Sequence, residues 1–132
     1  MREELENILY DYLKTSLPAE LKTMLVQGHT TDDRHIPYIS IDVGEIKPFG
    51  DMLESDGIFE SEVNVAIADS AHDIDYKYLF PRISAVRAIL GTFTLESEKY
   101  RCEGLWFESE TDARDDNNLG VVLTYKLVFQ KL

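Results

Sequence analysis

The residues best suited to chemistry lie in one short stretch, DSAHDIDYKY, at Asp69–Tyr78. His72 and Asp73 are adjacent there, and a His-Asp pair can hold a divalent cation that lowers the pKa of a bound water. His29 and His35 are available as further ligands. These residue types raise the hypothesis of a metal-dependent hydrolase.

The surroundings of the pair favour a structural role instead. It lies between an alternating strand pattern and the start of a helix, whereas HD-type hydrolases hold their ligands on packed helices. Ser70, Asp73 and Asp75 are suited to accept free backbone N–H groups at a helix entrance. We therefore expect a loop and helix cap here, with no metal, no cofactor and no catalytic residue.

A second acidic stretch, DARDDNNLG, resembles a calcium-binding loop only superficially. An EF-hand needs oxygen ligands at alternate positions, Gly at position six and Glu at position twelve. The three starting positions, Asp112, Asp115 and Asp116, all fail this pattern; the second, for example, places Leu119 at position five and Lys126 at position twelve. A solvated hairpin loop is favoured, and weak cation binding stays open.

Other catalytic patterns are missing from the sequence. Cys102 is the single cysteine, lies in a predicted strand and rules out an intramolecular disulfide. There is no G-x-S-x-G motif, the seven glycines form no phosphate-binding loop, and the histidines lack zinc-finger spacing. The sequence therefore predicts a protein that is not an enzyme.

Composition indicates one acidic globular domain, residues 1–132. The net charge of −12 disfavours binding to nucleic acid or to an anionic membrane. Carboxylates around a passage would, however, let DNA slide through without sticking. The charged N-terminus lacks the apolar core of a signal peptide, and no apolar run is long enough to span a bilayer, so a cytosolic protein is expected by default.

Hydrophobic spacing predicts the helices. Two helical pieces, or one kinked helix, are expected from about residue 3 to 26, because apolar residues recur there at three- and four-residue intervals. A second helix is expected from Leu79 to Leu90, ended by Gly91.

Alternation predicts the strands. IPYISIDVGEI and FESEVNVAIAD alternate, and the longest pattern runs from Leu119 to Phe129. Shorter strands are expected at Thr92–Glu96 and Tyr100–Glu108. One-sided burial indicates an α+β fold: a mainly antiparallel sheet of four or five strands with two helices packed on one face.

Three segments together resemble the tail-terminator and head-to-tail joining (neck) proteins of long-tailed bacteriophages. They are the N-terminal helix ELENILYDYLK, the strand–loop–helix VNVAIADSAHDIDYKYLFPRISAVRAIL, and the final strand GVVLTYKLVFQ. The likeness lies in the pattern of elements over most of the chain.

The resemblance implies a virion structural protein, assembled in the bacterial host cytoplasm. It would form a homo-oligomeric ring, commonly a hexamer, bind other phage tail or neck proteins, and let DNA pass without specific binding. The loops Lys47–Gly57 and Thr111–Asn118 are then expected to contact neighbours. Consecutive strand residues point to opposite faces, so one of Trp106 and Phe107 should be core and the other exposed. The interface candidates are Trp106, Phe107, Phe49, Asp112, Asp115 and Asp116.

Two alternatives from other classes stay open. An acidic inhibitor could mimic DNA and bind a DNA-binding protein, which the charge of −12 would suit. A metal-dependent hydrolase using His72 and Asp73 would require stoichiometric metal.

Overall fold

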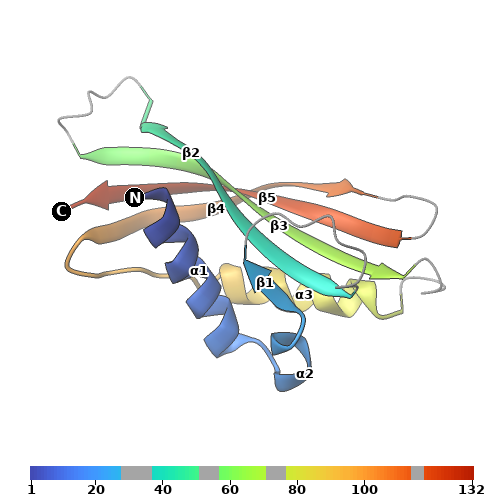
Figure 1. Cartoon of the computed structure of the whole chain (residues 1–132). Coiled ribbons are helices and arrows are strands. Elements are labelled where there is room, and N and C mark those ends of the chain that lie inside the picture. Colours follow the sequence, from blue (N-terminus) through green and yellow to red (C-terminus); the bar gives the residue numbers. More distant parts are fainter. Residues whose placement is uncertain (28–36, 51–56, 71–76, 114–117) are drawn as a thin grey trace.

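Residues 1–27, 37–50, 57–70, 77–113 and 118–132 are described by a computed structural model (Figure 1). The elements in chain order are α1 (Arg2–Ser16), α2 (Ala19–Lys22), β1 (Leu25–Gln27), β2 (Tyr38–Pro48), β3 (Ile58–Ser70), α3 (Leu79–Leu90), β4 (Tyr100–Asp112) and β5 (Asn118–Lys131).

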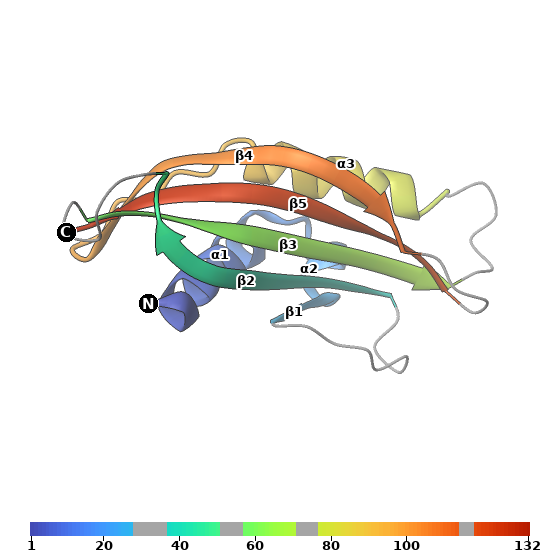
Figure 2. The ribbon, with the colours of Figure 1, turned by 90° about the horizontal axis from the view of Figure 1, so that it is seen from above.

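The strands form one twisted sheet in the order β1-β2-β3-β5-β4. Three neighbouring pairs are antiparallel, and β1 runs parallel to β2. The strand β5 lies between β3 and β4, so the last element in sequence is internal to the sheet (Figure 2).

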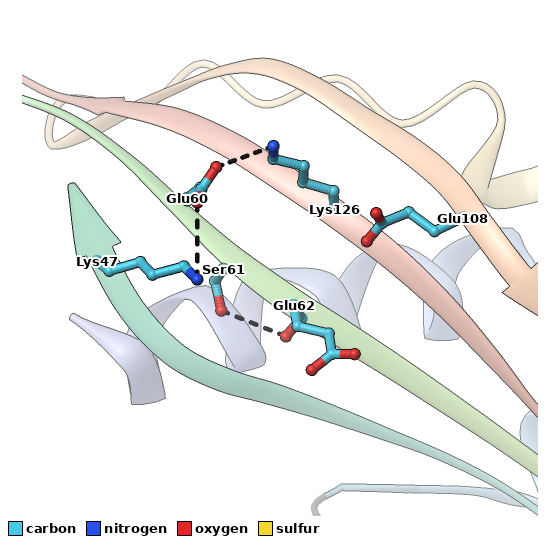
Figure 3. A pocket seen from close by; sticks show the side chains of 6 residues that line it. All are labelled: Lys47, Glu60, Ser61, Glu62, Glu108 and Lys126. Atoms are coloured by element: carbon cyan, nitrogen blue, oxygen red, sulfur yellow. Dashed lines mark hydrogen bonds and ion pairs between the residues drawn. The ribbon is translucent and has the colours of Figure 1, made fainter. Parts of the chain in front are cut away.

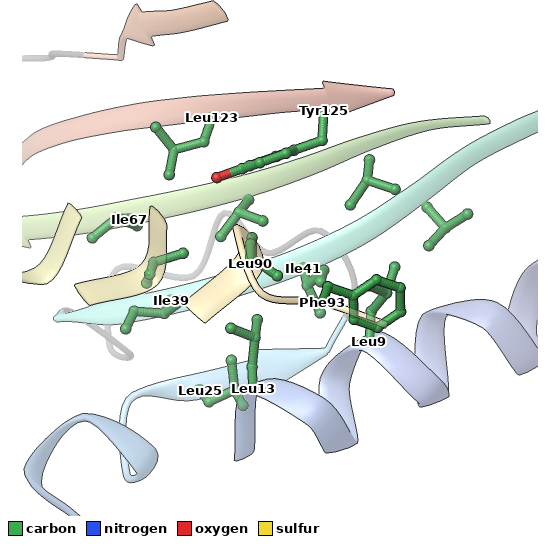
Figure 4. Packing of buried hydrophobic residues seen from close by; sticks show 14 of the residues in the cluster. Leu9, Leu13, Leu25, Ile39, Ile41, Ile67, Leu90, Phe93, Leu123 and Tyr125 are labelled. Atoms are coloured by element: carbon green, nitrogen blue, oxygen red, sulfur yellow. The ribbon is translucent and has the colours of Figure 1, made fainter. Parts of the chain in front are cut away.

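The core lies between the sheet and the helices α1 and α3, which are on the same side of the sheet in both views (Figures 1 and 2). Alternate strand residues such as Ile41, Ile67 and Leu123 are fully buried against helix residues such as Leu9 and Leu90 (Figure 4). Each such side chain contributes roughly 1.5–3 kcal/mol when removed from water. On the opposite face of the sheet, here called the outer face, none of the helices in the described residues packs (Figure 2).

The α+β class is confirmed, and several details of the prediction are corrected. The sheet is mixed, because the parallel pairing of β1 was not predicted. There are three helices in the described residues, since Pro18 separates α1 from α2, which confirms the alternative of two helical pieces. The second piece ends at Lys22 and not near residue 26, because Leu25–Gln27 pairs as β1. The strand expected at Thr92–Glu96 is wrong; only one isolated bridge, from Glu96 to Arg101, forms there.

Two strands reach further than their sequence patterns predicted. The strand β2 extends to Pro48, so the expected loop Lys47–Gly57 begins inside a strand. The strand β4 extends to Asp112, past the expected end at Glu108, so Thr111 also belongs to a strand. The pattern was hidden because the register of β4 on β5 shifts twice, between Cys102 and Gly104 and again after Phe107, and each bulge breaks the alternation.

Candidate functional site

The predicted His-Asp site falls on residues 71–76, which lie outside the described residues. The described residue that precedes them, Asp69, accepts a hydrogen bond from the guanidinium of Arg82 at 2.5 Å. Both side chains are largely buried, so this ion pair joins β3 to α3. The residue at the N-cap of α3 is Tyr78, whose own side chain makes no cap hydrogen bond. The expected capping residues Asp73 and Asp75 lie outside the described residues, so the predicted cap stays a prediction.

The described residues give no support to a metal site or an activated nucleophile. No group of three His, Cys, Asp or Glu side chains among them is arranged to hold a metal ion. Cys102 is half-buried, and this burial raises the pKa of its thiol. The hydrogen bond with the Gly104 backbone offsets part of that rise, and the Glu103 charge adds a smaller rise. A thiol held in its neutral form is a poor nucleophile.

The outer face instead carries a cluster of charged side chains (Figure 3), with aromatic side chains beside it. The Glu60 carboxylate on β3 lies 3.0 Å from Lys126 Nζ on β5 and 3.8 Å from Lys47 Nζ on β2. The Lys126 ammonium also lies 5.4 Å from the centre of the Phe49 ring. We call Lys47, Phe49, Glu60, Trp106 and Lys126 the outer-face cluster.

Trp106 joins this cluster through the register of β4 on β5, in which it is the partner of Lys126. Its side chain is 52% exposed. The ring lies against Gly104, where an added Cβ would come within 2.3 Å of ring atoms. The absence of a side chain at Gly104 therefore lets the indole lie flat on the outer face.

A shallow depression of about 240 Å³ lies in the same region, lined by Lys47, Glu60, Ser61, Glu62, Glu108 and Lys126. Glu62 and Glu108 have no cationic partner among the described residues. The arrangement can hold charged or aromatic groups of another molecule.

Phe107 lies on the opposite face of β4, where its ring packs edge-on against Tyr125 at 5.6 Å. The Arg87 guanidinium of α3 covers it, 4.0 Å from the ring centre. Burial raises the pKa of Tyr125, and the Arg87 charge partly offsets this. Phe107 is still 40% exposed, so the expectation that one of Trp106 and Phe107 would be core is wrong. The reason is that β4 is an edge strand, which the helices cover only in part.

The remaining interface candidates are distributed differently. Phe49 is half-buried in the outer-face cluster, and Asp112 is exposed at the end of β4. Asp115 and Asp116 lie outside the described residues, as does most of the loop after Pro48. Lys126 thus lies near the Phe49 ring and is the register partner of Trp106, whereas Phe107 lies on the other face of β4.

Sequence reasoning missed Lys126, Glu60 and Arg87, which organise these aromatic side chains. For Lys126, the sequence contains a signal that could have been used. Lys126 lies in the middle of the outward-facing positions of the last strand, where a long cation between Thr124 and Val128 marks a surface that can bind anionic or aromatic groups.

No protein-family model matches the sequence, and no curated protein matches it. Among solved structures, the chain is similar to a protein chain in the structure described as "Virion of native gene transfer agent (GTA) particle". The TM-score is 0.59, the sequence identity is 15%, and the match covers 90% of each chain. The two chains share a fold.

The structural match extends over nearly all of both chains and is not limited to one common motif. At this identity it concerns the arrangement of helices and strands only. In the described parts of the chain, no helix combines the length and the apolar character needed to cross a membrane.

Proposed function

We propose that this protein is a structural component of a phage-like particle, located at the tail or the head-to-tail junction, of the tail-terminator type and without catalysis. The observation that carries the proposal is the fold shared over 90% of both chains with a virion protein. The pattern of elements in the sequence points to the same class of protein.

In this proposal the chain forms a closed homo-oligomeric ring, a hexamer in the first instance, and binds other tail or neck proteins. Exposed aromatic side chains on a strand are frequent at protein interfaces, and Trp106 is the largest one on the outer face. The charge of −12 suits a ring through which DNA passes without specific binding. The protein would be found in the virion after assembly in the host cytoplasm.

The test is the native mass of the purified chain by light scattering over a concentration series, with electron microscopy of the same samples. A mass near six chain masses, or any closed ring, is the expected result. A monomer at every concentration, without rings on the grid, contradicts self-assembly and leaves only a ring that needs a templating partner.

A matched pair of variants locates the contact. Trp106→Ala should lower the native mass, whereas Tyr78→Ala should not, although Tyr78 is similarly exposed at 55% on the helix side. Circular dichroism checks that both variants fold. Equal effects of the two substitutions would remove Trp106 from the proposed contact.

The acidic composition supports one further candidate, an inhibitor that mimics DNA. The exposed carboxylates of β4 (Glu103, Glu108, Glu110 and Asp112) form part of that negative charge. This candidate predicts a monomer or dimer that competes with DNA for a DNA-binding enzyme, and a ring without such competition excludes it.

A further inference from the structure

The edge of β4 that faces away from β5 is paired near the start of the strand, and further along it has no partner among the described residues. Near its start, the Cys102 N–H donates to the Leu95 carbonyl at 2.9 Å, and Arg101 bridges to Glu96. From Gly104 to Asp112, no described residue pairs with the side of β4 that faces away from β5. A strand edge of this kind presents a row of backbone donors and acceptors to any extended segment.

A groove runs along the same edge. It has a volume of about 600 Å³ between α3 and β4, which lie alongside each other in Figure 2, and its lining includes Phe80, Ile83, Arg87 and Glu110. Phe80 is 55% exposed, and Phe107 lies at the edge under the Arg87 guanidinium. Side chains of an added strand that point to the helix side would enter this groove, because side chains alternate between the faces of a sheet.

The charges of β4 indicate the charge that a binding partner should carry. Its one basic residue, Arg101, is engaged by Glu103 at 3.4 Å and by Gln130 at 2.6 Å. The remaining charges of the free edge are the exposed carboxylates Glu108, Glu110 and Asp112. Carboxylates and bulges keep a strand edge from pairing with its own copy, but that role alone does not require exposed aromatic rings beside a groove.

We propose that the free edge of β4 binds an extended, basic segment of a different protein as an additional strand. Phe107, Glu110 and Asp112 share the groove side of β4, since their register partners Tyr125, Leu123 and Val121 all face the core. The bound segment places an apolar side chain against Phe107 and basic side chains opposite the two carboxylates.

Backbone hydrogen bonds give this mode its affinity, and the groove and charges give its specificity. A second copy of β4 is excluded as the occupant by like charge. The proposal goes beyond the structural role above and does not require a ring.

The probe is a nine-residue peptide of alternating Lys and Val with one central Phe, blocked at both ends and labelled for fluorescence anisotropy. The full chain should bind it and should show slowed amide exchange between Gly104 and Asp112. A version N-methylated at alternate residues keeps the charge but loses the hydrogen bonds of one edge. We expect its affinity to fall by about tenfold or more.

Two variants test the side chains. Phe107→Ala should weaken binding by about tenfold. The double variant E110Q/D112N should also weaken it, since both residues are exposed and the replacements keep their shape. The control is E3Q/E98Q, which removes the same charge from other exposed positions and should bind as the unmodified chain does.

Four results would overturn the proposal: no binding, equal binding of the N-methylated peptide, equal weakening by the control variant, or binding without amide protection in β4. If β4 amides become protected with protein concentration alone, the occupant is a second copy and the assignment to a different protein is wrong.

Discussion

Two neighbouring strands of almost equal length, β5 with 14 residues and β4 with 13, are buried in opposite ways. Every second residue of β5 from Leu119 to Phe129 is in the core, and its pairing with β3 runs without a register shift. The pairing of β4 shifts twice, and its last seven residues, Trp106–Asp112, are all exposed. One strand therefore holds the fold together, and the other presents side chains and backbone to other molecules.

The largest difference in stability between the two strands should appear when one leucine in each strand is replaced by alanine. Leu123→Ala in β5 should lower the free energy of unfolding by about 3–4 kcal/mol, because the site is fully buried and a cavity remains. Leu105→Ala in β4 should cost about 1 kcal/mol, since that side chain is only partly buried. Urea unfolding followed by circular dichroism measures both, and equal losses would contradict the division between the strands.

A smaller effect on stability is expected from substituting Gly104, which lies under the Trp106 indole ring. In Gly104→Ala the new Cβ displaces the far end of the Trp106 ring and should cost about 1 kcal/mol, with a shift in tryptophan emission. In the Trp106→Ala background the same substitution should cost less, which a double-mutant cycle measures. An unchanged cost in that background would show that the ring is not the obstacle.

Removing the ion pairs of the outer face should have a still smaller effect on the free energy of unfolding. Lys126→Met should cost less than about 1 kcal/mol, because a pair near the surface is screened by water and salt. Lys47→Met should cost less again, since Lys47 is 67% exposed and lies farther from Glu60. Unfolding at low and high salt is the measurement, and a salt-independent loss for Lys126 would point to lost packing.

The last predicted effect is a loss of stability that begins only at alkaline pH. Burial raises the pKa of Tyr125 above its ordinary value of 10.0, so the folded state resists deprotonation. Its contribution to stability is complete below pH 10.0 and is lost as the pH rises from there through the folded pKa. Tyr125→Phe should flatten this alkaline decline, and an unchanged decline would assign it to other groups.

The internal elements could be predicted because one-sided burial leaves a regular pattern. The helix from Leu79 to Leu90 and the apolar face of β5 follow directly from that regularity. The strand β1 could not be predicted, because Leu25–Gln27 is too short for a period and depends on pairing with a distant strand.

The surface features could not be predicted from the sequence, because they depend on the order of the strands in the sheet. A local sequence pattern does not contain that order. Trp106 and Phe107 are both exposed because β4 is at the edge, and Lys126 lies near the Phe49 ring only because β2, β3 and β5 lie side by side. The residues proposed for chemistry, His72 and Asp73, and the acidic pair Asp115 and Asp116 lie outside the described residues, so their roles stay predictions.

The internal position of β5 has a consequence for folding during synthesis. A ribosome makes β3 and β4 first, yet neither can pair with the other, because β5 belongs between them. Until Asn118–Lys131 emerges, the edges of β3 and β4 that pair with β5 in the finished sheet have no partner strand. Completion of the sheet therefore waits for its last strand, so a nascent chain arrested before Asn118 should depend on chaperones to stay soluble.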